Sequence, residues 1–291
     1  MAALSSSLIA RWDSMRAMKV YISVDMEGAA GVVHGDQCTR GKHGYDAAAE
    51  LMTLEANAAA LGAFDAGATE VLINDSHGDM RNLHLDRLDP RVQVLSGNLK
   101  QFSMAEGVEG GHYDVALFIG YHGGAGTLRA ILDHTYRSTV VAEVRINGRT
   151  INEAGLNALV AGHAGTPVGL VTGDENACRQ CAEILGDVDT VVVKWAVGRL
   201  AARSLHPEQA RTLIRAASAK AVRERDRFRP FAIDPPLTLE LDVVSTAMAD
   251  AAALMPGTER PSPRTLRFTA HEPLTVFRAL LSLIRLAATV L

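Results

Sequence analysis

The chain reads Lys19-Val20-Tyr21-Ile22-Ser23-Val24-Asp25-Met26-Glu27-Gly28 near its beginning, where a β-branched and aromatic run passes directly into two acidic residues and a glycine. This run predicts a buried strand over 19–24. After this strand, apolar residues recur at helical spacing, at Leu51, Leu54, Ala58 and Leu61, which predicts a helix. Gly67 stands where a left-handed C-cap would end that helix. A second strand is expected at 69–74. The stretch therefore opens a complete strand–helix–strand crossover.

The same alternation continues along the chain and predicts an α/β protein with a largely parallel central sheet flanked by helices. Further strands are expected at 92–95, 114–121, 167–172 and 190–194. Asn152 has the side chain of an N-cap, so a helix is expected to open at Glu153. The basic segment 201–230 predicts a solvated helix.

The chain is expected to divide into three parts. Residues 1–17 lack the basic start and apolar length of a secretory signal and are expected to form a disordered extension. Residues 18–235 form an α/β metal-binding catalytic domain, and 236–291 form a smaller α+β C-terminal portion. The apolar end of the chain is interrupted by Arg278 and Arg285, which favours a packed helix or an oligomer contact over a membrane span.

Composition disfavours several classes of protein. The 291 residues are 48% hydrophobic and 21% charged, which predicts a sizeable core and disfavours a disordered or fibrous chain. Lys and Arg number 29 against 33 Asp and Glu, a net charge of −4, so neither nucleic acid nor an anionic membrane is an expected partner.

The cysteines indicate the cellular compartment. Cys38, Cys178 and Cys181 are too few for a disulfide framework, and their odd number favours a reducing compartment, so a cytoplasmic protein is expected. The Cys178-x-x-Cys181 spacing also occurs in dithiol redox sites. It falls inside a predicted helix with no second cysteine pair, which disfavours a redox function.

Candidate ligands follow the ends of predicted strands, where open α/β sheets place their sites. Asp25 and Glu27 are two apart in extended chain and project to the same side. His77 follows the second strand, His122 follows the 114–121 strand, and Glu153 opens a helix. Alone, each residue would be an ordinary solvated or structural group. Together they form the mixed nitrogen and oxygen set that binds zinc or a related divalent ion.

Two further features leave alternatives open. His134, in Leu132-Asp133-His134-Thr135, could be another ligand, a proton-transfer group or an ordinary loop residue. The glycines of 120–126 resemble a phosphate-binding loop, but the Lys-Ser/Thr of a P-loop and the spaced glycines of a dinucleotide fingerprint are missing from the sequence. Nucleotide binding is therefore not favoured.

Several motifs together resemble the DppA-type D-aminopeptidases. They occur in the same order as in that family from about Met18 to the end of the chain, as Ser23-Val24-Asp25-Met26-Glu27-Gly28, Asn74-Asp75-Ser76-His77-Gly78, Gly97-Asn98, Phe102-Ser103-Met104, Gly120-Tyr121-His122, Asn152-Glu153-Ala154-Gly155-Leu156-Asn157 and Leu254-Met255-Pro256-Gly257-Thr258-Glu259. The resemblance implies a dinuclear zinc peptidase that removes D-amino acids from the N-termini of short peptides. It also implies a ring-shaped homo-oligomer, a decamer.

The resemblance also assigns roles to residues. It implies two zinc ions per subunit, with His134 as the catalytic histidine and the metal ligands at Asp25, Glu27, His77, His122 and Glu153, Asp25 being the candidate bridge. Two divalent ions can share a water, lower its pKa and polarise a scissile carbonyl. Two other functions fit the same residues: a metal-dependent amidase acting on non-peptide amides, and a peptide- or metabolite-binding protein with a structural metal. Selectivity for D-residues rests on the resemblance alone.

Overall fold

The computed structural model describes residues 17–291, and the extension expected at 1–17 lies, apart from Ala17, outside the described residues. A central seven-stranded sheet has the order β3-β2-β1-β4-β7-β8-β9, in which only the β8–β9 pair is antiparallel. Its strands are β1 (Lys19–Val24), β2 (Glu70–Asp75), β3 (Gln93–Leu95), β4 (Val115–Tyr121), β7 (Val168–Asp174), β8 (Asp189–Gly198) and β9 (Ala201–Ser204). All six strands expected for this sheet are present, and the predicted α/β class is confirmed.

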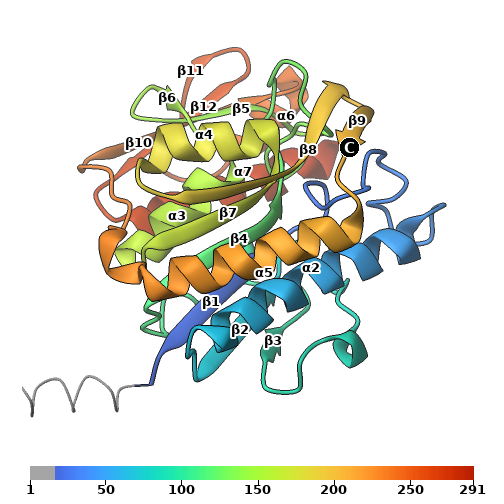
Figure 1. The fold of residues 1–291 in the computed structure, drawn as a ribbon. Helices are drawn as coiled ribbons and strands as arrows, with labels where there is room; N and C mark the ends of the chain where they lie inside the picture. Colours follow the sequence, from blue (N-terminus) through green and yellow to red (C-terminus); the bar gives the residue numbers. More distant parts are fainter. Residues whose placement is uncertain (1–16) are drawn as a thin grey trace, which may run out of the picture.

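Helices cover both faces of the central sheet (Figure 1). One face carries α2 (Tyr45–Asp65) and α5 (Pro207–Arg223), and the other carries α3 (Glu153–His163) and α4 (Glu175–Leu185). The helices α2 and α5 approach closely, since a Cβ added at Gly62 would lie 2.2 Å from the Arg215 carbonyl oxygen. Short 3₁₀ turns complete the helical elements, at Leu85–Arg87, Ser103–Ala105, Arg225–Arg227 and Ala288–Val290.

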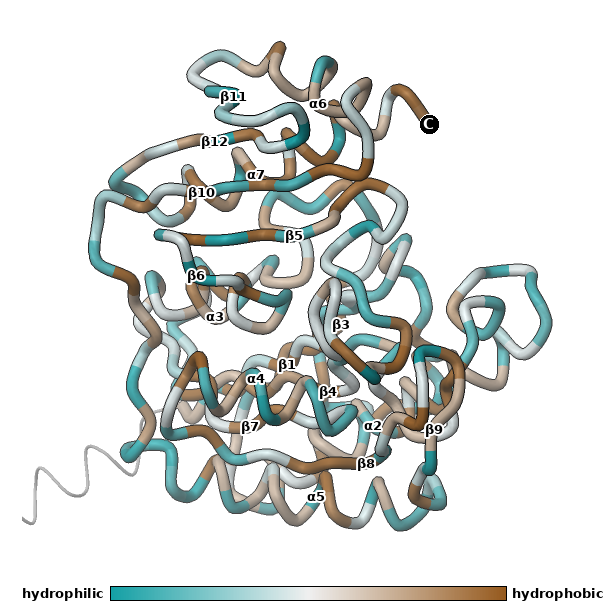
Figure 2. The backbone as a smooth tube through the Cα atoms, turned by 90° about the horizontal axis from the view of Figure 1, so that it is seen from above, coloured by the Kyte–Doolittle hydropathy of each residue, from teal (hydrophilic) through white to brown (hydrophobic). Residues whose placement is uncertain are grey.

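A second, antiparallel sheet lies beyond α3 and has the order β11-β12-β10-β5-β6. Its strands are β5 (Val141–Ile146), β6 (Arg149–Thr150), β10 (Leu237–Val243), β11 (Glu259–Ser262) and β12 (Thr265–Ala270), and its helices are α6 (Thr246–Ala252) and α7 (Pro273–Ala287). Seen from above, α3 lies between this sheet and the central one (Figure 2).

The second sheet combines distant parts of the sequence. Strand β10 pairs with β12 on one side and with β5, from the middle of the chain, on the other. Strands β5, β6, β9 and β11 were not expected from the sequence. The division at residue 235 stays a prediction, and the antiparallel sheet takes strands from both sides of it.

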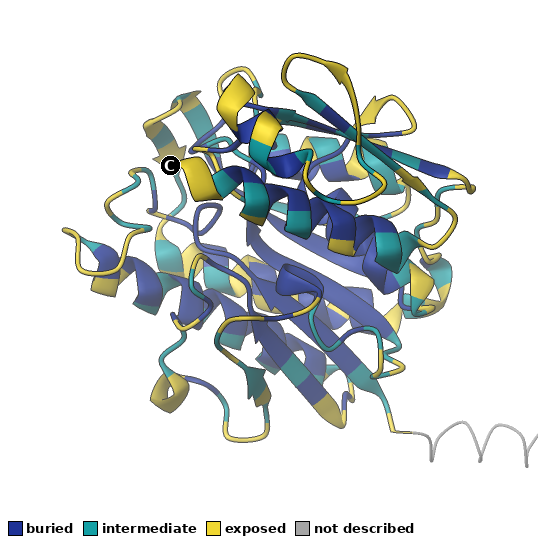
Figure 3. Cartoon of the chain, turned by 180° about the vertical axis from the view of Figure 1, so that it is seen from behind, coloured by how far each residue is buried: buried dark blue, intermediate teal, exposed yellow. Residues whose placement is uncertain are grey.

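Burial explains why these segments form these elements. Residues 20–24 of β1 are buried on both faces, as in the centre of a parallel sheet, and β10 alternates buried and half-buried residues, as in a sheet with one solvated face. The buried central strands lie between more exposed outer layers (Figure 3). Residues 273–290 are apolar and long enough to cross a membrane, but α7 packs into the core through Val276, Leu280 and Leu283. This confirms the packed C-terminal helix.

Candidate metal centre

The candidate ligands meet where three neighbouring parallel strands end. Val24 of β1 is in register with Asp75 of β2 and Ile119 of β4, so the chain leaves all three strands at the same edge of the sheet. Asp25, His77 and His122 follow these strand ends, and Glu153 is the first residue of α3. Asn152 caps that helix by accepting a hydrogen bond from Gly155 N at 2.9 Å, which fixes the position of Glu153.

Two glycines allow the loops of this site to touch. Gly28 N donates a hydrogen bond to Gly120 O at 2.8 Å, and Asp25 N donates to Ile119 O at 2.8 Å. A Cβ at Gly28 would lie 1.9 Å from Tyr121 O, and one at Gly120 would lie 2.2 Å from Asp25 O. Only glycine permits this approach, which brings the Asp25–Gly28 loop against the loop of His122.

The side chains form one buried cluster. Asp25, Glu27, His77, His122 and Glu153 are each between 3% and 7% exposed. The Asp25 carboxylate directs one oxygen to each histidine, with Oδ1 3.3 Å from His77 Nδ1 and Oδ2 3.5 Å from His122 Nε2. Glu27 Oε2 lies 2.9 Å from His77 Nδ1, and Glu153 Oε2 lies 3.4 Å from His122 Nε2. Asp25 therefore stands between two histidine–carboxylate pairs.

The backbone determines which histidine nitrogens face the carboxylates. His77 Nε2 lies 2.8 Å from Cys38 O, His122 Nδ1 lies 2.9 Å from Gly123 O, and His134 Nδ1 lies 2.8 Å from Leu132 O. A carbonyl only accepts, so each of these nitrogens carries a proton, and the neutral imidazole then presents a lone pair on the other nitrogen. Metal-binding histidines are oriented in the same way.

Three buried atoms of the cluster have no hydrogen bond of acceptable geometry: Asp25 Oδ2, Glu27 Oε2 and His122 Nε2. Glu27 Oε2 does have the short ion-pair distance to His77 given above, so its contact is electrostatic rather than a well-directed hydrogen bond. Buried polar atoms without partners are rare, and acceptors that face acceptors require a cation between them. The donor set and the unpaired atoms fit a divalent metal.

The electrostatics of the cluster also indicate a need for positive charge. Burial, followed by the charge of Glu27, raises the pKa of Asp25 to about 7. Burial opposes protonation of His77 and His122, yet the surrounding carboxylates hold the pKa of both histidines well above the usual value. Three carboxylates in one buried site therefore attract cations strongly.

His134 lies at the edge of this cluster and is half-buried. Its ring stacks on that of His122, with centroids 4.1 Å apart and an interplanar angle of 12°. His134 Nε2 is 3.7 Å from Glu153 Oε1, which also accepts a hydrogen bond from Tyr136 N at 2.6 Å. The structure thus brings together all six residues selected from the sequence, and their individual roles remain predictions.

Two residues at the cluster were missed by the sequence analysis. Cys38 offers its sulfur within 4.8 Å of ligand atoms of Glu27 and His77. Lys194 of β8 is fully buried and donates hydrogen bonds to the carbonyl oxygens of Glu27, Ala29 and Val32. Burial lowers the pKa of Lys194 to about 8. Neither residue belongs to a sequence motif that would have identified it, because Cys38 is a single cysteine in a loop and Lys194 lies inside the segment predicted as strand β8.

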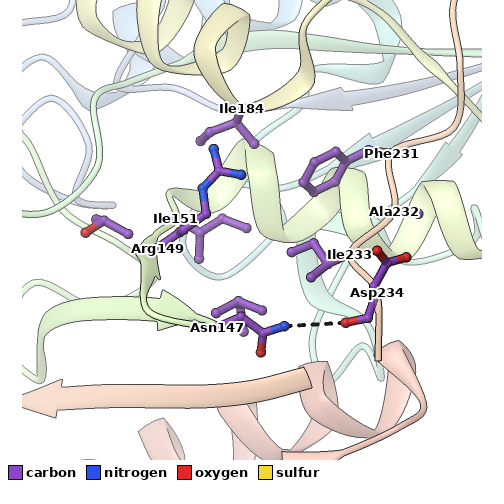
Figure 4. Close-up of a pocket in the computed structure, with 10 residues that line it drawn as sticks. Asn147, Arg149, Ile151, Ile184, Phe231, Ala232, Ile233 and Asp234 are labelled. Atoms are coloured by element: carbon purple, nitrogen blue, oxygen red, sulfur yellow. Dashed lines mark hydrogen bonds between the residues drawn. The ribbon is translucent and has the colours of Figure 1, made fainter. Parts of the chain in front are cut away.

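A pocket of about 210 Å³ opens beside the cluster and is lined by Glu27, His77, His134 and Glu153 together with residues of α7. A larger cavity of about 340 Å³ lies elsewhere, between the β5–β6 hairpin, the end of α4 and residues 231–234 (Figure 4). None of the six selected residues lines the larger cavity. We therefore assign the chemistry to the smaller pocket, where the titratable groups converge.

The cysteines of α4 stay apart from this site. Cys178 and Cys181 are free and buried, and neither belongs to a candidate metal group among the described residues. Burial raises the pKa of both thiols, that of Cys181 to about 12. Neither is therefore an activated thiolate.

Fold and site define an α/β protein with a buried site for divalent cations at the carboxyl edge of its parallel sheet. The chain belongs to the D-aminopeptidase family, whose model matches residues 18–282. The D-aminopeptidase of Bacillus subtilis (strain 168) is 37% identical over 274 residues, which cover 93% of this chain and 98% of that protein.

A solved structure gives the same result. The Zn-dependent D-aminopeptidase DppA from Bacillus subtilis, described as a self-compartmentalizing protease, matches this structure with a TM-score of 0.90 at 37% sequence identity. The match covers 93% of this chain and 98% of the other. The family resemblance inferred from the sequence motifs is confirmed.

Proposed function

We propose that this protein is a zinc-dependent D-aminopeptidase that hydrolyses the N-terminal residue of short peptides or amino-acid amides. The observation that carries the proposal is the buried cluster of three carboxylates and two histidines with three unpaired polar atoms, in a chain of the D-aminopeptidase family. Its similarity to a Zn-dependent D-aminopeptidase over nearly the whole chain supports zinc as the metal.

Asp25, Glu27, His77, His122 and Glu153 would hold two zinc ions, with Asp25 as the bridging carboxylate. The position of Asp25 between the two histidines supports this assignment. Bound zinc would supply Lewis-acid polarisation of the scissile carbonyl and lower the pKa of a water molecule.

His134 would move a proton during the reaction. Its Nδ1 is committed to the Leu132 carbonyl, so its Nε2 is the nitrogen that can exchange a proton with the substrate. The stack on His122 and the place of His134 in the pocket wall hold this nitrogen close to the cluster. Donation to the leaving amine or stabilisation of the oxyanion both fit this position.

The assembly and location follow from the same relationship. We propose a soluble homo-oligomer, a ring-shaped decamer, by analogy with the self-compartmentalizing relative. A cytoplasmic location agrees with three free cysteines among the described residues. Analytical ultracentrifugation of the purified protein measures the subunit number.

Metal analysis combined with a panel of D- and L-aminoacyl amides, short peptides and non-peptide amides tests the function. We expect about two zinc ions per chain and turnover of the D-aminoacyl substrates. Asp25→Ala and His122→Ala should each lose metal and activity with an unchanged circular dichroism spectrum, whereas the exposed control Asp36→Ala should keep both. Metal retention without turnover would indicate a binding protein, and cleavage of non-peptide amides alone would indicate an amidase.

A further inference from the structure

We propose that the Cys38 thiolate is a further ligand of the metal that Glu27 and His77 would hold, so that this position has a sulfur donor. The inference rests on the proposed zinc site and extends its ligand set. The Cys38 sulfur, a Glu27 carboxylate oxygen and a His77 ring nitrogen all lie within 4.8 Å of one another. Zinc–sulfur and zinc–nitrogen bonds of about 2.3 and 2.0 Å place two donors of a tetrahedral zinc roughly 3.5 Å apart. Small side-chain movements therefore bring the three donors to one ion.

The Glu27 carboxylate is an independent sign of a cation at this position. Glu27 is 7% exposed, and its Oε2 atom has no hydrogen bond of acceptable geometry. This oxygen lies 2.9 Å from His77 Nδ1, the nitrogen that carries the lone pair of the neutral ring. Two acceptors that face each other in a buried site are stabilised by a cation bound to both. The Cys38 sulfur therefore lies beside two groups that already favour a cation.

The backbone of Cys38 determines how His77 faces the site. The Cys38 carbonyl oxygen accepts a hydrogen bond from His77 Nε2 at 2.8 Å, which leaves Nδ1 to face Asp25 and Glu27. Carbonyl groups commonly orient metal-binding histidines in this way. One residue thus orients a proposed ligand through its backbone and offers a donor of its own through its side chain.

Hydrogen bonds fix the loop that carries Cys38. Cys38 N donates to Gly35 O at 3.1 Å. The Gln37 side chain accepts from Val33 N at 2.8 Å and donates to Gly31 O at 3.2 Å. The Cys38 side chain is half-buried and packs against the hydrophobic core that β1 and α2 share. The sulfur therefore keeps its place beside the cluster.

A sulfur ligand makes the two proposed metal positions chemically different. Asp25 directs one carboxylate oxygen to His77 and the other to His122. On the His77 side, Glu27 and Cys38 complete a set of four protein donors, the number that closes a tetrahedral zinc site. On the His122 side the protein donors number three, which leaves a fourth position for water or substrate.

The donor types also differ between the two positions. When sulfur binds the ion, the S–H proton passes to solvent and the thiolate supplies the electron pair of the new bond. Soft thiolate ligands favour soft ions such as zinc over hard ions such as magnesium and manganese. The Cys38 position should therefore be the more selective of the two, and it should prefer cadmium, which is softer still.

The near-ultraviolet spectrum of the cobalt-loaded protein tests the ligand, because a thiolate-to-cobalt charge-transfer band requires a bond between sulfur and the ion. The protein is freed of metal with a chelator and titrated with Co²⁺. We expect the band in the wild type and in Cys178→Ser/Cys181→Ser, where Cys38 is the remaining thiol of the three in the chain. Cys38→Ser should lack the band and keep its circular dichroism spectrum. The spectrum of the double variant tests the proposal even if Cys38→Ser does not fold.

Competition with a chelator measures what sulfur contributes to affinity. Cys38→Ser should bind one of its zinc ions about tenfold or more weakly and lose the preference of that position for cadmium, because a hydroxyl is a harder and weaker donor. The matched control Cys178→Ser/Cys181→Ser should keep both properties.

The outcomes separate this proposal from the aminopeptidase function. A sulfur band in a protein that hydrolyses none of the D-aminoacyl substrates would support the Cys38 ligand and refute the aminopeptidase. Hydrolysis by a protein whose cobalt form shows no band would overturn the Cys38 ligand and leave the aminopeptidase standing. A band that persists in Cys38→Ser, or unchanged affinity of that variant for zinc, would likewise overturn the ligand.

Discussion

Lys194→Met removes the ammonium group that holds the loop carrying Asp25 and Glu27, and keeps most of the aliphatic side chain. Three carbonyl oxygens, of Glu27, Ala29 and Val32, lose their donor in a buried site. An unpaired buried acceptor costs about 1–3 kcal/mol. Methionine carries no charge, so the variant avoids the cost of burying an ammonium group, which offsets several kcal/mol of the summed cost of the three unpaired carbonyl oxygens. We expect a net destabilisation of about 3 kcal/mol.

Calorimetric melting and zinc competition with a chelator measure the effect. For a domain of this size about 3 kcal/mol corresponds to a fall in Tm of roughly 6–12 °C. The affinity for zinc should fall by about 10–100-fold, as is usual when a group that orients ligands is lost. The control Lys220→Met removes an exposed lysine that pairs with Asp189 and Glu224, and should cost less than about 1 kcal/mol. A Lys194→Met protein with wild-type zinc affinity and a Tm within about 2 °C of wild type would refute this reasoning.

Three further changes test the site and its surroundings. His134→Ala should keep its metal but lower kcat roughly a hundredfold or more, with a smaller change in KM; loss of one zinc equivalent in metal analysis would make His134 a ligand. Burial raises the pKa of Glu55 to about 7 against the nearby charge of Lys194. The contribution of Glu55 to stability is therefore full below its unfolded pKa of 4.5 and is lost as the pH rises through about 7. Urea titrations at a series of pH values give the free energy of unfolding, and in Glu55→Gln its fall between pH 4.5 and about 7 should be smaller than in the wild type by up to about 3 kcal/mol. The same pH dependence of the unfolding free energy in both proteins would contradict this. Replacing Cys178 and Cys181 together by serine should leave kcat/KM close to wild type, and a collapse of turnover in a folded protein would restore the redox hypothesis.

The sequence predicted much of the site because parallel strands bring their carboxyl ends to one edge. Asp25, His77 and His122 follow adjacent strands, and the N-cap at Asn152 predicted where Glu153 would lie. None of these inferences needed knowledge of tertiary packing. The positions of these residues after predicted strands were sufficient to place them together, because β1 pairs in parallel with both β2 and β4 and the three strands end at the same level.

Other features depend on contacts that local pattern does not encode. Strand β5 reads Val-Ala-Glu-Val-Arg-Ile, whose polar residues gave no clear strand signal, and it is stabilised by pairing with β10 nearly a hundred residues later. Lys194 occupies a position in β8 where an apolar residue would fit the strand pattern equally well. Its function becomes visible only when the three carbonyl groups it binds are in place.

The position of α7 in the pocket wall has a consequence during synthesis on the ribosome. All six candidate active-site residues and Lys194, which holds the loop of Asp25 and Glu27, precede residue 195, while Leu281 and Arg285 are made about 90 residues after Lys194, which corresponds to roughly 4–18 s at ordinary elongation rates. A nascent chain can therefore assemble the cluster long before the substrate pocket has its second wall. The enzyme can become able to hold metal well before it is able to select a peptide.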